Sequence, residues 1–310
     1  MNLKSLLGGL ALAAAFTVPA LADDAIKIGF ITKFPVPFYT DMVNGAKDYA
    51  AKNPGIDVVY GQGTSATDID GQIALIDSMI SQGVKGIAIT PVDPSVSKEL
   101  DKAIAAGIKV VLMDNSIPDW KGQTALATTN NLEAGKVAGK FLATILKDGD
   151  KLGIIEGVPG VPALDDRVNG MLAGLNNDKV VIAGKGASNC TEELGINVAQ
   201  DLLTANPDLK AIYSACGPPA AGAAQAIKNA KLDGKVMLVG FDWCCGERDA
   251  MKSGIEVASV AQFPYKMAQF GVDALIKAIK GGTVDSLIDS GAGLVTPDVM
   301  DSDLFKGGGN

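Results

Sequence analysis

The segment KVVLMD at residues 109–114 is an apolar run that ends in a carboxylate, and the pattern returns as KVMLVGFD at residues 235–242. Apolar runs of this length indicate strands that are buried on both faces of a sheet. Each run follows an amphipathic helical pattern, at residues 95–106 and 219–230. Strands that alternate with helices in this way form a parallel sheet that helices cover on both faces. The two segments therefore predict two similar α/β units.

The alternation extends from these segments in both directions. We expect further strands at residues 25–31, 56–60, 86–90, 151–155, 180–183 and 209–214, and a short extended piece at 293–295. We expect further helices at residues 38–52, 67–82, 131–146, 165–175, 192–205 and 265–280. The helix at residues 95–106 is expected to begin with Ser95 as its cap. The predicted fold class is α/β, with two similar open parallel-sheet, Rossmann-like lobes.

Length and composition exclude several classes of protein. A chain of 310 residues is too long for one ordinary core, so two domains are expected. The net charge is −8 and Lys and Arg form no cluster, which argues against nucleic-acid binding. The absence of histidine removes the commonest general base and the commonest metal ligand. Carboxylate or lysine chemistry stays open, but we expect no catalytic residue, no metal site and no cofactor.

Residues 1–22 are typical of a signal peptide. A lysine precedes an apolar stretch at residues 6–18, and ALA at residues 20–22 is a small-x-small cleavage pattern. The alternative is a membrane anchor, for which this stretch is short. We therefore expect export, with a mature chain that starts near Asp23. All four cysteines lie in the C-terminal half, and in an oxidising compartment an even number suggests disulfides.

Each of the two opening segments ends in an aspartate, Asp114 in the first and Asp242 in the second. In open parallel sheets, ligands bind outside the carboxyl ends of the strands. If the two units face each other, both carboxylates point into one cleft. Each aspartate alone fits equally well as the cap of a following turn, but the matched pair favours the cleft. We expect Asp242→Ala to lower ligand affinity strongly and to leave the fold intact.

A series of further segments occurs in an order that resembles ribose-binding-protein-like solute receptors. The series consists of PFY at 37–39, GIAITPVD at 86–93, AAGIKVV at 105–111, TNN at 129–131, GVPG at 157–160, VGFD at 239–242 and AQFP at 261–264. The resemblance covers nearly the whole mature chain. It implies a type I periplasmic binding protein, in which three crossovers form a hinge between two lobes and a sugar is trapped between them. DNA-binding repressors share this fold, but they carry a helix-turn-helix where this chain has its signal peptide.

The resemblance also implies the function and the domains. We expect a periplasmic solute-binding protein of a sugar ABC importer, and not an enzyme. Its ligand is expected to be a neutral monosaccharide or polyol. We expect it to be a monomer that delivers this ligand to a permease in the inner membrane. A receptor for a sugar-like signal or for chemotaxis is the alternative, and a glycosidase with paired carboxylates is a further rival. The expected N-terminal lobe consists of residues 23–128 and 264–291, and the C-terminal lobe of residues 129–263 and 292–310.

Four ligand-binding side chains are expected from the first lobe. The resemblance implies that Phe38 and Tyr39 stack on the sugar, although both also fit as packing at the start of a helix. Asp114 matches the family's sugar-binding aspartate, and Asn115 follows it where ribose receptors carry an arginine. A sugar hydroxyl both donates and accepts hydrogen bonds, so carboxylate and amide groups suit it.

From the second lobe, Asp242 and Gln262 match ligand-contacting positions of the family. Arg167 matches the second arginine of a family motif, and the first falls on Asp165, which we also place at the ligand. Trp243 is a stacking candidate or, alternatively, a core residue. These replacements predict a pocket that is more acidic and less basic than that of a ribose receptor.

The four cysteines fall at the expected ligand face of the second lobe. A family phenylalanine falls on Cys190 and a ligand asparagine on Cys216, so both are ligand candidates, as is Cys244. Our hypothesis pairs Cys190 with Cys216 and Cys244 with Cys245, so that a disulfide forms an apolar surface under the sugar. Cross-pairing of the same four residues and free buried thiols are the alternatives.

Overall fold

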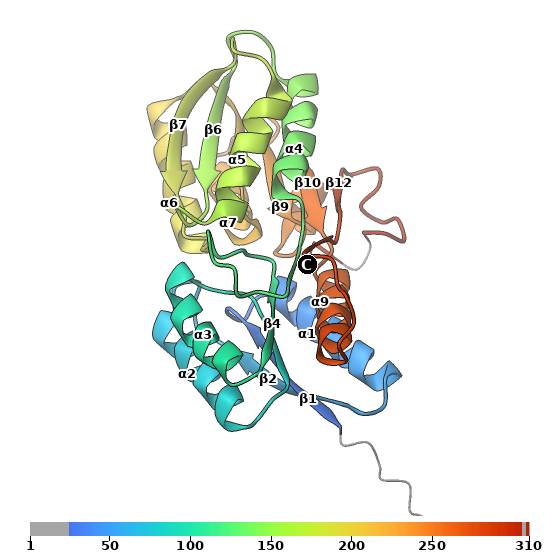
Figure 1. Cartoon of the computed structure of the whole chain (residues 1–310). Coiled ribbons are helices and arrows are strands. Elements are labelled where there is room, and N and C mark those ends of the chain that lie inside the picture. Colours follow the sequence, from blue (N-terminus) through green and yellow to red (C-terminus); the bar gives the residue numbers. More distant parts are fainter. Residues whose placement is uncertain (1–24, 306–307, 310) are drawn as a thin grey trace, which may run out of the picture.

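Two six-stranded sheets form the framework of the protein (Figure 1). The computed structural model describes residues 25–305 and 308–309, and the signal peptide expected at residues 1–22 lies outside the described residues. None of the helices in the described ranges has the length and apolar character that a membrane crossing needs.

The first sheet is entirely parallel and has the strand order β11-β5-β4-β3-β1-β2. Its strands are β1 (Ile26–Thr32), β2 (Ile56–Gln62), β3 (Gly86–Ile89), β4 (Lys109–Met113), β5 (Ala125–Thr128) and β11 (Leu287–Asp289). Helices α1 (Pro37–Lys52) and α9 (Pro264–Ile279) cover one face, and α2 (Ile69–Ser81), the 3-10 turn η1 (Pro94–Val96) and α3 (Ser97–Ala105) cover the other.

Strand β4 shows why the apolar runs need helices on both faces. Val111 and Met113 are buried in the core beneath α1 and α9, whereas Val110 and Leu112 are buried beneath α2 and α3. Successive side chains of a strand point to opposite faces, so an unbroken apolar run fills two cores at once. The run that ends in Asp114 is therefore a central strand, and its carboxyl end lies at the middle of the sheet edge.

The second sheet has the strand order β12-β10-β9-β8-β6-β7, with β12 antiparallel to β10. Its strands are β6 (Lys151–Glu156), β7 (Val181–Ala187), β8 (Leu209–Ser214), β9 (Met237–Asp242), β10 (Glu256–Gln262) and β12 (Ala292–Val295). Helices α4 (Asn131–Ile145) and α5 (Pro162–Leu175) cover one face, and α6 (Glu192–Ala205), α7 (Gly217–Asn229) and α8 (Glu247–Lys252) cover the other.

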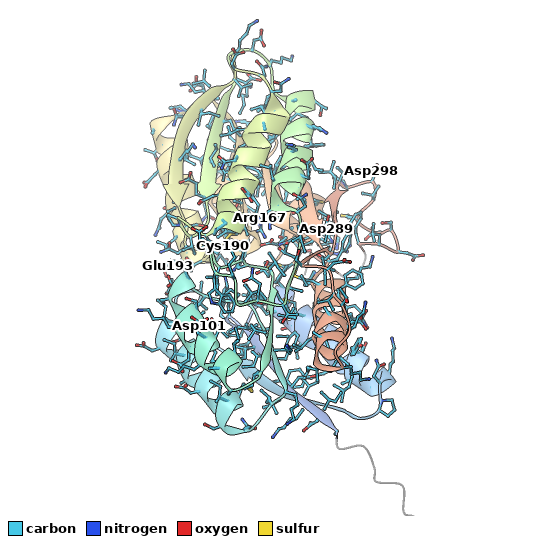
Figure 2. All side chains as sticks on the ribbon, viewed as in Figure 1. Asp101, Arg167, Cys190, Glu193, Asp289 and Asp298 are labelled. Atoms are coloured by element: carbon cyan, nitrogen blue, oxygen red, sulfur yellow. A yellow bond between two sulfur atoms is a disulfide. The ribbon has the colours of Figure 1, made fainter. Side chains whose placement is uncertain are left out.

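Helices α4 and α5 approach each other closely because both present glycines at their contact. A Cβ atom at Gly139 would lie 2.0 Å from the carbonyl oxygen of Met171, and one at Gly170 would lie 2.2 Å from that of Leu132. The close contact sets the position of α5 against α4, and Arg167 extends from α5 toward the space between the lobes (Figure 2).

The chain passes between the two sheets three times. It crosses from β5 to α4, returns from β10 to α9, and crosses again from β11 to β12 (Figure 1). The carboxyl ends of the parallel strands of each sheet face those of the other sheet. This arrangement confirms the predicted α/β fold with two lobes and a hinge of three crossovers.

The elements that the sequence analysis left unassigned are short or lack a clear apolar period. They are the strands β5, β10 and β11 and the helix α8. The expected cap at Ser95 is wrong, because the carboxylate of Asp93 accepts the hydrogen bond from the backbone N–H of Ser95 and η1 begins there. Asp93, two residues earlier, is therefore the residue that caps this segment.

Candidate ligand-binding site

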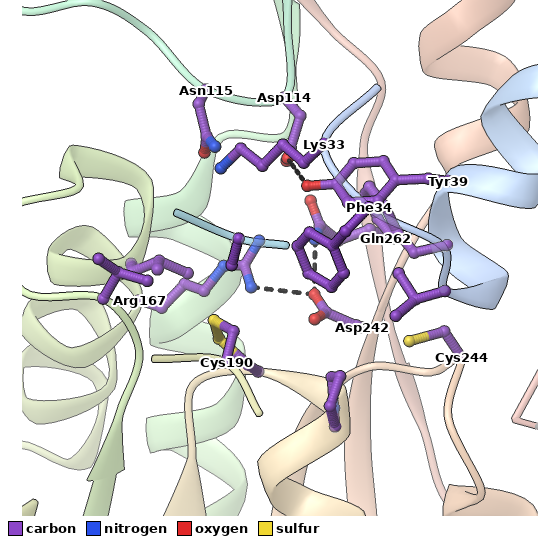
Figure 3. A pocket seen from close by; sticks show the side chains of 17 residues that line it. Lys33, Phe34, Tyr39, Asp114, Asn115, Arg167, Cys190, Asp242, Cys244 and Gln262 are labelled. Carbon is purple, nitrogen blue, oxygen red and sulfur yellow. Dashed lines mark hydrogen bonds and ion pairs between the residues drawn. A yellow bond between two sulfur atoms is a disulfide. The ribbon is translucent and has the colours of Figure 1, made fainter. Parts of the chain in front are cut away.

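A cavity lies between the two lobes, where the carboxyl ends of the two sheets meet (Figure 3). It encloses about 540 Å³ of space, which includes open solvent at its mouth. Loops from both lobes line it, and its charged side chains are largely buried. The lining residues are Lys33, Phe34, Val36, Phe38, Tyr39, Ala66, Asp114, Asn115, Val158, Leu164, Arg167, Cys190, Cys216, Pro218, Asp242, Cys244 and Gln262.

Asp114 follows the end of β4 and brings the first carboxylate into the cavity. The hydroxyl of Tyr39 donates to Asp114 Oδ2 at 3.2 Å, and Thr128 Oγ1 donates to the Asp114 carbonyl at 2.6 Å. The Asp114 backbone has a φ of 64°, a left-handed conformation that aspartate tolerates better than most residues. Burial raises the pKa of the Asp114 carboxyl, and the cations of Lys33 and Arg167 oppose that rise.

Asp242 ends β9 and brings the second carboxylate into the cavity from the opposite lobe. Its Oδ1 accepts hydrogen bonds from Arg167 Nη1 at 2.9 Å and from Gln262 Nε2 at 2.7 Å. Its Oδ2 accepts one from the backbone N–H of Gly217, at the start of α7, at 2.9 Å. The positive end of the α7 dipole therefore adds to the positive charge of the arginine at this carboxylate. Both oxygens of Asp242 are held in fixed directions.

Arg167 is fixed by three further groups of the second lobe. Its Nε donates to Asn131 Oδ1 at 2.9 Å, and its Nη1 also donates to the Ala215 carbonyl at 2.9 Å. Its guanidinium lies 4.1 Å above the centre of the Phe241 ring, and the Asn131 amide donates in turn to the Thr129 carbonyl. Asn131 is thereby a support for the arginine at the hinge. The guanidinium is planar, so these contacts orient its remaining N–H groups.

Lys33 is a charged residue of the cavity that the sequence analysis missed. Only 7% of the residue is exposed, and its ammonium points into the cavity beside Asp114 and Asn115 (Figure 3). Burial lowers the pKa of Lys33 to about 8, against the opposing effect of Asp114. Lys33 directly follows β1, so the rule that placed Asp114 at a strand's carboxyl end would have found it.

The presence of Lys33 changes the expected charge of the site. Two cations, Lys33 and Arg167, stand beside two carboxylates, Asp114 and Asp242. Lys33 is an ammonium group that the expectation of a more acidic and less basic pocket did not include, so that comparison with ribose receptors stays a prediction. Two amides, those of Asn115 and Gln262, complete the polar lining.

The apolar part of the lining comes from aromatic rings and from disulfides. Phe34 and Phe38 each contact the Tyr39 ring edge-on, with centroids 5.3 and 5.2 Å away. On the second lobe, a disulfide joins Cys190 to Cys216 with a Cα–Cα distance of 5.7 Å. A second disulfide joins the neighbours Cys244 and Cys245. The pairing agrees with our hypothesis and not with cross-pairing or free thiols, and three of the four cysteines line the cavity.

Two residues of the predicted ligand set do not line this cavity. Asp165 is exposed and lines a neighbouring groove, because residues two apart on a helix point to nearly opposite sides and Arg167 takes the inner side of α5. Trp243 is buried behind the cavity, where its Nε1 donates to the Phe305 carbonyl at 2.9 Å. The alternative that Trp243 is a core residue fits this position. We leave both out of the ligand set below.

The site holds no arrangement of ligands suited to a metal ion. In residues 25–305 and 308–309, no three side chains among Cys, Asp and Glu converge as metal ligands would. The two carboxylates of the cavity instead accept hydrogen bonds from tyrosine, arginine, glutamine and a helix terminus. The arrangement is suited to holding a polar molecule in a fixed orientation through many directional bonds.

Comparisons with known proteins agree with this geometry. Residues 28–283 match the family model described as the periplasmic binding protein domain. A D-ribose/D-allose-binding protein of Pseudomonas aeruginosa is 30% identical over 270 residues, which cover 84% of this chain and 85% of that protein. A ribose import binding protein of Salmonella typhimurium is 30% identical over 292 residues, which cover 92% and 96%.

Solved structures are similar over almost the whole chain. A carbohydrate transporter solute-binding protein from Agrobacterium radiobacter, in complex with D-arabinose, has a TM-score of 0.84 and 26% identity, and the match covers 94% of this chain and 100% of that one. An ABC transporter solute-binding protein from Agrobacterium vitis with bound D-fucose has a TM-score of 0.85 and 28% identity, with coverage of 91% and 99%.

Proposed function

The chain belongs to the periplasmic binding protein family, and we propose that it binds a neutral monosaccharide or polyol for an ABC importer. The resemblance predicted from the sequence is thereby confirmed. The relatives named above include binding proteins for ribose and allose and a carbohydrate transporter solute-binding protein, and by this likeness we assign binding without turnover to this cavity.

The observation that carries the proposal is the balance of charge in the cavity. Two cations and two carboxylates give a site without net charge, and a buried charged ligand would leave one partner uncompensated. Carboxylates accept hydrogen bonds from sugar hydroxyls, whereas Lys33 and Arg167 donate to their oxygens. Amides such as those of Asn115 and Gln262 do both. A polyhydroxy compound satisfies all of these groups at once.

We assign the contacts to the two lobes as follows. Phe38 and the Phe34 ring offer apolar surface for the C–H groups of the sugar from the first lobe, and the disulfides offer it from the second. The polar contacts come from the first lobe through Lys33, Tyr39, Asp114 and Asn115, and from the second through Arg167, Asp242 and Gln262. A missing hydroxyl would leave one of these buried polar groups without its ligand partner, so this set selects among sugars as well as binding them.

We further propose that binding is coupled to hinge closure. The proposed lobes are residues 23–128 with 264–291 and residues 129–263 with 292–310, so that each strand crossover lies at a boundary. A sugar that contacts Asp114 on one lobe and Asp242 on the other stabilises the closed form over the open form. The membrane permease of the importer then recognises the closed, loaded protein, which acts as a monomer.

The family indicates a periplasmic location, and we propose that residues 1–22 are removed on export as a signal peptide. Disulfides form and persist in that oxidising compartment. The two disulfides at the cavity are consistent with it.

A thermal-shift screen tests the function. The mature chain is heated with pentoses, hexoses, deoxy sugars, inositols and linear polyols, and any stabilising compound is confirmed by calorimetry. A ligand at about 100 times its Kd adds about 2.7 kcal/mol to the free energy of unfolding, which raises the Tm clearly. The expected result is a stabilising neutral compound that is recovered unchanged after incubation. Stabilisation by sugar acids or sugar phosphates alone, or hydrolysis of a glycoside, would contradict the proposal.

A further inference from the structure

Glu247 lies behind the wall of the ligand cavity that the Cys244–Cys245 disulfide forms. It is the first residue of α8, and its carboxylate turns back toward the preceding loop. Its Oε2 accepts a hydrogen bond from the backbone N–H of Cys244 at 3.1 Å and another from that of Cys245. The side chain is completely buried. One carboxylate therefore satisfies the backbone donors of both cysteines.

The loop that carries the cysteines needs such support, because much of its backbone is left-handed. The φ values are 89° at Asp242, 55° at Trp243 and 98° at Gly246. Non-glycine residues adopt this region only when their surroundings stabilise it. The Glu247 carboxylate stabilises the loop from the inside by pairing N–H groups that would otherwise be buried without an acceptor.

The disulfide held in this way contacts both the cavity and the other lobe. Cys244 is 6% exposed and belongs to the apolar core of the first lobe, which includes Phe38, and Cys245 packs against the same core. On its other side, the disulfide lies against the start of α7. A Cβ atom at Gly217 would lie 2.8 Å from Cys244 Sγ and 3.0 Å from Glu247 Oε1. A side chain at position 217 would therefore collide with the disulfide and the carboxylate, so only glycine fits there.

From these contacts, we propose that Glu247 is a positioning residue for ligand binding, which acts by holding the Cys244–Cys245 disulfide against the cavity and against the first lobe. The inference rests on the proposed function, because the disulfide matters for binding only if the cavity takes a ligand with apolar C–H surface. Glu247 itself does not line the cavity, so its effect on affinity passes through the cysteines.

A double-mutant cycle tests this inference with the sugar identified in the screen. Glu247→Ala and Glu247→Gln are each made in the wild-type chain and in a Cys244→Ala/Cys245→Ala background, and Kd is measured by calorimetry. When Glu247→Ala is the only substitution, Kd is expected to rise at least tenfold. Glu247→Gln is expected to stay within about threefold of wild type, because the amide oxygen still accepts both backbone bonds. Without the cysteines, Glu247→Ala is expected to change Kd by less than twofold.

Controls separate this role from a general effect on folding. Glu193→Ala, at an exposed glutamate near the start of α6, is the matched control and should bind as wild type does. The Tm of every variant is recorded without ligand, and Glu247→Asp, whose shorter side chain cannot reach both N–H groups, replaces the alanine variant if that variant does not fold.

Each outcome has a definite meaning. Wild-type affinity in Glu247→Ala, an equal loss in Glu247→Gln, or the same loss with and without the cysteines would overturn the inference and leave the proposed function standing. A wild-type protein that binds none of the compounds would overturn the proposed function, and this inference with it.

Discussion

Arg167 Nη1 lies 2.9 Å from Asp242 Oδ1, and the two side chains are only 4% and 11% exposed. The pair joins α5 to the end of β9 at the floor of the cavity. Gln262 and the backbone of Gly217 contact the same carboxylate. The charges are therefore arranged before any ligand binds, which reduces the cost of ordering them on binding.

Asp242→Ala is expected to lower stability as well as ligand affinity. Removal of the carboxylate leaves Arg167 buried without its counter-charge, which costs about 3–5 kcal/mol. From the sequence we expected Asp242→Ala to leave the fold intact, but the contacts of Asp242 with Arg167 predict a loss of stability. Asp242→Asn keeps an oxygen for Arg167 and should fold better, yet bind sugar at least tenfold more weakly. Urea unfolding and calorimetry measure the two effects, and unchanged affinity in Asp242→Asn would refute a ligand role.

Tyr39→Phe is expected to weaken sugar binding without a large change in stability. The variant removes the hydroxyl that donates to Asp114 at 3.2 Å, and keeps the ring that packs against Phe34 and Phe38. A hydrogen bond of this kind contributes about 1 kcal/mol, so Kd should rise about fivefold. Tyr60→Phe, at a tyrosine that is 37% exposed outside the cavity, is the control. Equal affinities for the two variants would contradict the orientation of Asp114 by Tyr39.

Lys33 is expected to make the free energy of unfolding and the affinity for the ligand change with pH in the alkaline range. Burial lowers the pKa of Lys33 from 10.5 to about 8 in the folded protein. Between these values the unfolded chain binds more protons, so the free energy of unfolding should rise with pH from about 8 to 10.5, by about 3 kcal/mol in total. Below about pH 8 the cost of burying the charge is constant.

Ligand affinity should change in the opposite direction, because the neutral amine above about pH 8 donates weaker hydrogen bonds to sugar oxygens. Urea unfolding and calorimetry between pH 7 and pH 10 measure both trends. Lys33→Met should abolish the rise in stability and the fall in affinity over this range. If the variant kept the wild-type pH profiles, the titrating group would be another residue.

The Cys190–Cys216 disulfide is expected to contribute more to stability than the Cys244–Cys245 disulfide. The first closes a loop across 26 positions, for which loss of chain entropy in the unfolded state predicts about 3 kcal/mol. The second joins neighbours, and so restricts the unfolded chain much less. Urea unfolding of Cys190→Ala/Cys216→Ala and Cys244→Ala/Cys245→Ala measures the difference. Peptide mapping without reduction should recover both pairs, and four alkylatable thiols in the native protein would exclude them.

The candidate site could be predicted from the sequence only where a single strand or a family motif marked a residue. Asp114 and Asp242 were found because each directly follows a strong apolar run. Lys33 follows a strand equally closely, but none of the family motifs quoted from the sequence includes it. Asp165 was placed at the ligand from its position in a motif, although the turn of α5 points it away from Arg167.

Sequence alone was enough for the class of fold, for the two-lobed organisation and for the acidic ends of two central strands. These follow from the spacing of apolar side chains along short segments, which depends on near neighbours in the chain. The pairing of polar side chains was set by folding: Tyr39 donates a hydrogen bond to Asp114, and Arg167 forms an ion pair with Asp242, each across 75 positions of sequence. Coulomb attraction and desolvation depend on distance and burial in three dimensions, and no local pattern encodes these quantities.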